Sequence, residues 1–175
     1  MEAFLRKLCH EALSSLTELN IVKMTDSTNI APNPASLIMA RHMVPYSAME
    51  AIVNLSFDSF ELRKLLHILS MCEELQVPLR RDEKKVLNAL HHDVRFRIIS
   101  DLAPSKVKVQ KPSQKAFVLL QGSIGQHYLE SYALRQEMTK MAEIAMRMLT
   151  AAEAYAVEDT GHGIIALACL QLRRR

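Results

Sequence analysis

Residues 80–85 (Arg-Arg-Asp-Glu-Lys-Lys) form the densest run of charge in the 175-residue chain. One interpretation is the solvated first turn of a helix, because its two acids suit the positive end of the helix dipole and the flanking cations offset them. The other is a positive patch that contacts phosphates. That patch would consist of Arg80, Arg81, Lys84 and Lys85. The pattern taken alone favours the solvated turn.

A second pair of cations, Lys140 and Arg147, lies seven residues apart in a stretch with helical periodicity. That spacing places both on one face of a helix, where they could meet successive phosphates of a nucleic-acid backbone. Glu143 lies between them and partly cancels their field. Taken alone, this spacing is explained more simply by an ordinary solvated helix face.

His91-His92-Asp93 is the local cluster that most resembles metal ligands. Adjacent helical residues point about 100° apart, so both imidazoles would not easily face one ion. Histidines at the negative end of a helix explain the cluster better. The sequence also contains no phosphate-binding GxxxxGK[ST] loop, no GxSxG and no HExxH motif. We therefore predict a non-enzymatic chain without a cofactor or metal of its own.

The composition favours a mainly α protein. Hydrophobic residues make up 49% of the chain, and it has only 4 Gly and no Trp beside 10 Met. The net charge of +3 is too small to argue for nucleic acid by itself. The three cysteines Cys9, Cys72 and Cys169 lie far apart, which predicts a reduced intracellular compartment. No apolar run approaches the ~20 residues that a membrane span needs, so no membrane contact is expected.

The first 45 residues predict a helix over 3–19 that ends at Asn20, followed by short strands at 21–24 and 30–31. Asn33 then caps a helix that begins with a proline and closes before Pro45. A helix followed by a small hairpin is typical of the second half of a winged helix. We therefore predict a partial winged-helix region over residues 1–45.

Residues 46–175 predict a helical bundle. The stripe from Leu62 to Leu75 indicates a helix capped by Asp58 or Ser59, and a further helix begins near Asp82. Residues 100–113, rich in Ser, Pro and Lys, predict a mobile surface loop made basic by Lys106, Lys108 and Lys111. The remaining helices are expected at 46–54, 114–128, 134–157 and 162–173, the third of these with an inner stripe of Met138, Met141, Ala145, Met148, Ala152 and Tyr155.

The block from Leu79 to Leu90, followed by Asp93 and residues 95–98, resembles a signature of one helicase family. These are the meiotic crossover DNA helicases of the Mer-three type, in the Ski-two-like group of helicase superfamily two. Their pattern here is Leu-Arg-x-x-Glu-Lys-Lys-x-Leu-Asn, and residues 79–88 keep every specified position.

Three weaker blocks agree with this resemblance in order and spacing. Residues 30–41 resemble the exit of the family's winged helix, although Ser36 and Leu37 replace a usual Gly-Arg. Residues 109–111 and 115–119 resemble the start of the second helical half. Residues 134–137, with Arg147, resemble a Leu-Thr-Gln-Asp helix and a later Gly-x-Arg-Ile. The resemblance as a whole spans about residues 5–172.

The resemblance implies the end of a winged helix leading into a Sec-sixty-three-type helical bundle. In relatives the bundle lies against the motor domains, and one long helix faces the translocating single strand like a ratchet. The helix at 134–157 matches it, and Arg147 matches a strand contact. Ala145 stands where Gly is common, and Thr150-Ala151 stand where some members carry Arg-Trp. Base stacking, worth about 1–3 kcal/mol per base, is therefore missing at that position.

The resemblance implies an accessory region of a nuclear, ATP-dependent helicase acting in meiotic recombination and crossover formation. ATP and magnesium would belong to motor domains outside this chain, which we expect to be a fragment. The implied partners are single-stranded or branched DNA, those motor domains and recombination proteins. The alternative is a standalone helical scaffold that binds proteins and not nucleic acid. The salt dependence of single-strand binding separates the two, because phosphate contacts weaken steeply between ~50 and ~200 mM salt.

Overall fold

The computed structural model describes residues 2–26, 29–55, 62–100, 106–158 and 163–173, and within them the chain is mainly α-helical. The elements in chain order are α1 (Glu2–Glu18), β1 (Val22–Met24), β2 (Ile30–Pro32), α2 (Pro34–Arg41), α3 (Tyr46–Val53), α4 (Leu62–Ser70), the 3-10 turn η1 (Glu73–Leu75), α5 (Glu83–His92), the 3-10 turn η2 (Val94–Phe96), α6 (Pro112–Ile124), α7 (Tyr132–Glu158) and α8 (Gly163–Arg173). The mainly α fold class is confirmed.

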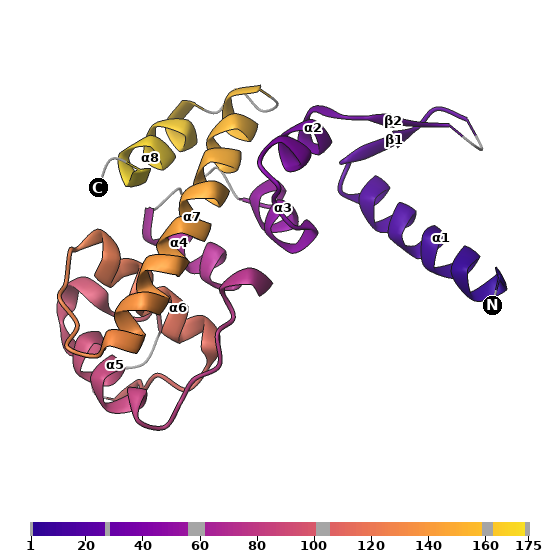
Figure 1. The fold of residues 1–175 in the computed structure, drawn as a ribbon. Coiled ribbons are helices and arrows are strands. Elements are labelled where there is room, and N and C mark those ends of the chain that lie inside the picture. The colour runs from indigo at the N-terminus through magenta and orange to yellow at the C-terminus, as the bar shows by residue number, and fades with distance from the viewer. Residues whose placement is uncertain (1, 27–28, 56–61, 101–105, 159–162, 174–175) are drawn as a thin grey trace.

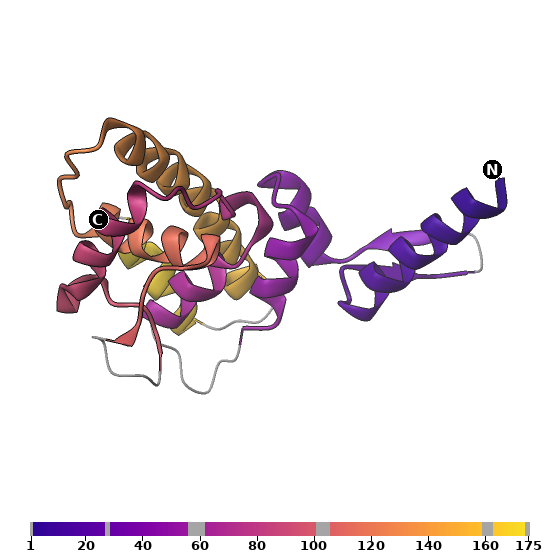
Figure 2. The same ribbon diagram turned by 90° about the horizontal axis from the view of Figure 1, so that it is seen from below.

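Helix α1 and the β1–β2 hairpin project away from the other helices (Figures 1 and 2). None of the α1 side chains is buried. The helix ends at Glu18, close to the predicted end at Asn20, and Asn20 adopts a left-handed φ of 55° that turns the chain toward β1. The strands are antiparallel, with Lys23 opposite Ala31. The predicted helix and strands are therefore present at the expected places.

Asn33 precedes α2 at the expected N-cap position, but its side chain makes no capping bond. Its Nδ2 instead donates to the Asn20 carbonyl at 2.8 Å and to the Asn20 side chain at 2.9 Å. The amide therefore holds the end of α1 against the start of α2.

The predicted stripe from Leu62 to Leu75 is divided between α4 and η1. Helix α4 ends at Ser70, and Gln76 Nε2 donates to the Ser70 carbonyl at 2.6 Å. This bond satisfies a carbonyl that the helix end leaves open. Cys72 and Leu75 remain buried, so the stripe predicted burial correctly and the helix length wrongly. The predicted caps, Asp58 and Ser59, lie outside the described residues.

Helix α6 runs through the middle of the bundle, and its eight residues from Lys115 to Gly122 are all buried. It begins at Pro112, inside the predicted loop, and Val107 and Val109 just before it are also buried. The described part of that loop is therefore packed against the bundle, while residues 101–105 lie outside the described residues. The helix ends at Ile124, earlier than predicted, because Gly125 caps it and Gln126 turns the chain with a left-handed φ of 52°.

Helix α7 is the longest described helix and packs against α2, α3, α6 and α8 (Figure 1). Its predicted inner stripe is confirmed, since five of the six residues are buried and Met138 is partly buried against the core. Among the described residues, no helix is both long and apolar enough to cross a membrane.

Candidate nucleic-acid interface

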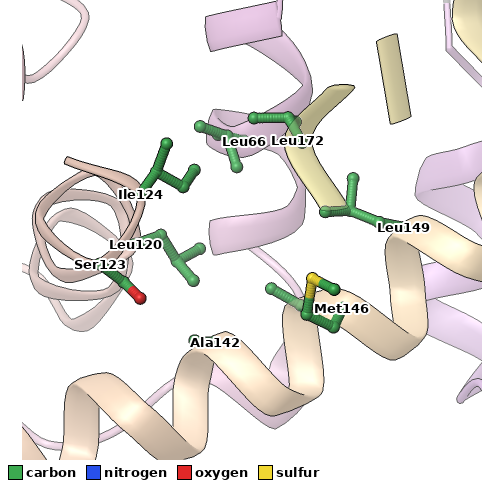
Figure 3. Close-up of a pocket in the computed structure, with 9 residues that line it drawn as sticks. Leu66, Leu120, Ser123, Ile124, Ala142, Met146, Leu149 and Leu172 are labelled. Atoms are coloured by element: carbon green, nitrogen blue, oxygen red, sulfur yellow. The ribbon is translucent and has the colours of Figure 1, made fainter. Parts of the chain in front are cut away.

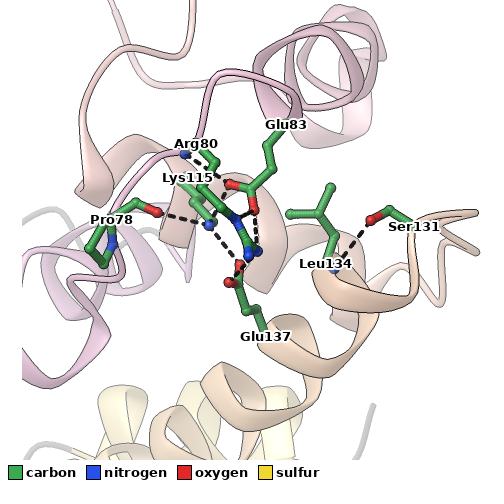
Figure 4. A network of polar contacts seen from close by, with 7 residues as sticks. All are labelled: Pro78, Arg80, Glu83, Lys115, Ser131, Leu134 and Glu137. Carbon is green, nitrogen blue, oxygen red and sulfur yellow. Dashed lines mark hydrogen bonds and ion pairs between the residues drawn. The ribbon is translucent and has the colours of Figure 1, made fainter.

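Two of the residues in the family-like block, Arg80 and Glu83, belong to a charge cluster with a buried centre and an exposed arginine, which joins α5, α6 and α7 (Figure 4). Lys115 of α6 is fully buried, and its Nζ lies 2.7 Å from Glu83 Oε2 and 2.6 Å from Glu137 Oε2. The same Nζ donates to the Pro78 carbonyl at 3.1 Å. The Arg80 guanidinium pairs with Glu83 and with Glu137, the latter at 2.7 Å.

The charges in this cluster compensate one another. Burial alone would raise the pKa of Glu83, but hydrogen bonds from Lys115 and from Arg80, with the Lys115 charge, hold it below its ordinary value. Hydrogen bonding to Glu83 raises the pKa of Arg80. The buried Glu83 carboxylate and the buried Lys115 ammonium group thus lie beside charges of the opposite sign, without which their burial would be costly.

This cluster gives the Arg-x-x-Glu part of the signature a structural role. The charge run makes Arg80 a candidate phosphate contact, and the structure places its guanidinium between the Glu83 and Glu137 carboxylates. The sequence gives Lys115 and Glu137 no role beyond their place in the weaker family-like blocks. A lone lysine before the apolar run of residues 116–120 is the one sequence signal that points to a buried partner.

The other three cations of the run are exposed, Lys84 and Lys85 in the first turn of α5 and Arg81 just before it. None of them forms an ion pair with another described residue. Their charges therefore face solvent and remain open to a phosphate.

The segment before α6 adds further cations beside α5. Val109 N donates to Asn88 Oδ1 at 2.8 Å, which fixes the segment against the helix. Burial alternates from Lys106 to Gln110, so Lys106 and Lys108 point outward while the two valines point inward. The predicted basic character of this segment thus appears on the same side of the bundle as α5.

The two candidate cations of α7 lie in different surroundings. Lys140 is exposed, with no ion pair to any other described residue. Arg147 is partly buried, pairs with Glu74 and donates to the Met43 carbonyl at 2.8 Å. Its guanidinium therefore ties α7 to η1 and to the α2–α3 connection.

The two histidines of the His91-His92-Asp93 cluster lie in the last turn of α5, as the sequence predicts. His91 is buried in the last turn of α5, and its Nδ1 accepts a hydrogen bond from Ile98 N at 3.0 Å. Asp93 caps η2, and hydrogen bonds from Arg95 lower its pKa to about 2. Among the described residues, no group of histidine, cysteine, aspartate and glutamate could hold a metal ion.

An apolar cavity of about 90 Å³ lies between α4, α6, α7 and α8 (Figure 3). The side chains that line it are Leu66, Leu120, Ser123, Ile124, Ala142, Ala145, Met146, Leu149 and Leu172. Ser123 contributes the one hydroxyl in that set. The lining offers contact with an apolar group but no acid or base that could activate the Ser123 hydroxyl.

Comparison with known proteins identifies the bundle. Residues 32–175 match the family model of the Sec63 Brl domain. A probable ATP-dependent DNA helicase HFM1 of Mus musculus is 29% identical over 147 residues, covering 81% of this chain and 10% of the helicase. The ATP-dependent DNA helicase homolog MER3 of Arabidopsis thaliana is 30% identical, covering 68% of this chain and 11% of that protein.

A more distant relative is the human U5 small nuclear ribonucleoprotein 200 kDa helicase, 27% identical over 82% of this chain and 6% of the helicase. The chain thus spans about a tenth or less of the length of these relatives. The resemblance to Mer-three-type helicases is confirmed by these matches. Because the domain model covers nearly all of the bundle, the chain belongs to the Sec63 Brl domain family.

Proposed function

We propose that the chain is the non-catalytic accessory region of a nuclear, ATP-dependent DNA helicase that acts in meiotic recombination and crossover formation. The observation that carries this proposal is the similarity to DNA helicases over 81% of the chain. In this role residues 1–45 form the end of a winged helix, and residues 46–175 form a bundle that supports the motor. ATP and magnesium act at the motor, and the bundle guides single-stranded DNA.

The exposed cations support the strand-guiding part of this role. Lys140 on α7 and Lys84 and Lys85 on α5 present charges to solvent without a carboxylate partner in the described structure. Arg147 and Arg80 hold the elements that carry these cations, through Glu74 and Glu137. We therefore assign phosphate contact to the exposed cations, including Arg81, and a positioning role to Arg80 and Arg147.

A salt titration of single-stranded DNA binding tests the proposal. The affinity of the chain for an oligonucleotide should fall steeply between ~50 and ~200 mM salt, because bound phosphates release counterions. Replacing Lys84, Lys85 and Lys140 with Gln should reduce the slope of log affinity against log salt by about 2, at about 0.7 per single-strand phosphate contact.

The matched control removes three exposed cations from the projecting part of the chain. Replacing Arg6, Lys7 and Lys23 with Gln changes the net charge equally and should leave the slope nearly as it was. An equal decrease of the salt slope in both triple variants would mean that binding depends only on the overall charge of the chain. Absent binding of the unaltered chain at ~50 mM salt would refute the strand-guiding role.

The second candidate function is a scaffold that binds proteins without nucleic acid. The observation in its favour is the apolar surface of α1, where Phe4, Leu5 and Leu8 are 64%, 53% and 46% exposed. Exposed apolar residues that share a surface often mark protein interfaces. Replacing Phe4 and Leu8 with Ser should abolish capture of such a partner and leave binding of single-stranded DNA unchanged.

A further inference from the structure

Two exposed tyrosines flank Arg135 where the chain enters α7, and we call Tyr128, Tyr132 and Arg135 the tyrosine ledge. The tyrosines are 73% and 68% exposed. The Arg135 guanidinium carbon lies 5.0 Å from the centroid of the Tyr128 ring and 5.9 Å from that of Tyr132. Large aromatic side chains exposed this far contribute little to the core, and tyrosine and arginine are enriched at recognition sites.

Hydrogen bonds hold the ledge in one conformation. Arg135 Nη1 donates to the Tyr128 hydroxyl at 2.9 Å and to the Leu129 carbonyl at 2.6 Å. Gln136 Nε2 donates to the Tyr132 hydroxyl at 2.7 Å. Two exposed rings are thus fixed before any partner arrives, which lowers the entropy cost of stacking a ligand on them.

Tyr128 also forms part of a cleft of about 600 Å³ between α5 and the α6–α7 connection. One wall comes from α5 and includes Lys85, while the other comes from residues 127–131. The volume lies within the range of pockets that hold small ligands, which is enough for one nucleotide. Lys85 therefore places an exposed cation in the same cleft as an exposed aromatic ring.

The ledge connects the two groups of cations already assigned to phosphates. At about 100° per helical residue, Tyr132, Gln136 and Lys140 lie within about 80° of one another around α7. Tyr132 is therefore on the face that carries Lys140, while Tyr128 shares its cleft with Lys85. A single strand that touches both cations would cross the ledge.

The charges in the cleft indicate how a nucleotide would lie. Asp93 also lines it, but its carboxylate is already engaged by Arg95 at 2.7 Å. Glu130, at the Tyr128 end, would repel a phosphate but can accept a hydrogen bond from a base amino group. The phosphate therefore belongs at Lys85 and the base at Tyr128.

We propose that the cleft holds one nucleotide of a single DNA strand, with its base stacked on Tyr128 and its phosphate bound by Lys85. This inference rests on the proposed function and gives it a stacking site. Thr150-Ala151 offer no aromatic ring near Arg147, whereas the ledge supplies two at the opposite end of α7. A base inside a duplex is covered on both faces, so the site selects single strands.

Substitution of Tyr128 tests the inference. Tyr128→Ala should weaken binding of a single-stranded oligonucleotide about tenfold, as expected for the loss of one stacked base. The salt slope should stay unchanged, because no phosphate contact is removed. Tyr128→Phe keeps the ring and should bind within about twofold of the unaltered chain. Lys85→Gln should reduce the slope by about 0.7.

Phe4→Ala is the matched control, since Phe4 is a similarly exposed aromatic on α1, and it should leave affinity unchanged. A 2-aminopurine base in the oligonucleotide should lose fluorescence on binding, and Tyr128→Ala should restore it. Wild-type affinity of Tyr128→Ala, or equal weakening toward single strands and duplex, would overturn the stacking site and leave the proposed function intact. Absent single-strand binding by the unaltered chain would instead refute the proposed function.

Discussion

At the scale of single residues, Lys115 is the side chain whose role depends most on its surroundings. It is fully buried at the start of an apolar run, with two carboxylates and a backbone carbonyl around its ammonium group. Burying a charge is costly unless it is paired, and here the pairs join three helices. Lys115 thus determines how α5, α6 and α7 meet.

Lys115→Met should lower the free energy of unfolding by about 3–5 kcal/mol, because it leaves the Glu83 and Glu137 carboxylates without their buried partner. Urea denaturation followed by circular dichroism measures this change. Lys84→Met is the control, since Lys84 is exposed, and it should alter stability by no more than about 0.5 kcal/mol. Similar stabilities for the two variants would show that the cluster contributes little.

At the scale of elements, the end of α6 depends on contact with η2. A Cβ atom added at Gly125 would lie 2.6 Å from Phe96 Cε1 and 2.9 Å from its Cζ. Phe96 is only 1% exposed and has little room to move. Gly122, one turn earlier, would place its Cβ 3.5 Å from Leu90 and 3.6 Å from Met138, which is ordinary contact.

Substitution of these two glycines by alanine should therefore change the stability of the chain in opposite directions. Gly125→Ala should destabilise the chain by about 1–3 kcal/mol, because the new methyl group overlaps a buried ring. Gly122→Ala should stabilise it by about 1 kcal/mol, because alanine favours the helix interior. Thermal unfolding of the two variants and of the unaltered chain measures both changes in stability. A stabilising Gly125→Ala would contradict the close packing of Phe96 on the α6 terminus.

At the scale of the whole molecule, burial is distributed unevenly along the chain. Helix α1 has no buried side chain, whereas α6 buries eight consecutive residues among its neighbours. Packing within the bundle therefore stabilises α6 and α7 and contributes little to the stability of α1. Regions with few buried contacts open at lower free energy than the core.

Native-state amide hydrogen exchange, measured by mass spectrometry on the 175-residue chain, should show this difference. Amides of α1 should exchange through local opening close to zero free energy, because a helix of 17 residues without packing is marginal in water. Amides in the middle of α6 should exchange only through global unfolding. Equal protection of the two helices would mean that α1 is stabilised by contacts that its exposure does not suggest.

The sequence by itself determined the mainly α fold, most helix positions and the family resemblance. Apolar spacing is a local property, so the inner stripe of α7 could be assigned from it alone. The end of the first helix near Asn20 and the proline that opens α2 were likewise visible in the residue types. Arg81, Lys84 and Lys85 were also candidates, because they belong to the densest charge run in the chain.

The tertiary structure alone decided which candidate cations remain open to a phosphate. Arg80 pairs with a glutamate 57 residues away, and Arg147 donates to a carbonyl 104 residues away. Tyr128 of the tyrosine ledge likewise shares a cleft with Lys85 only because the α6–α7 connection folds against α5. Such partners are fixed by helix packing across the bundle. The spacing of residues within one segment therefore cannot predict them.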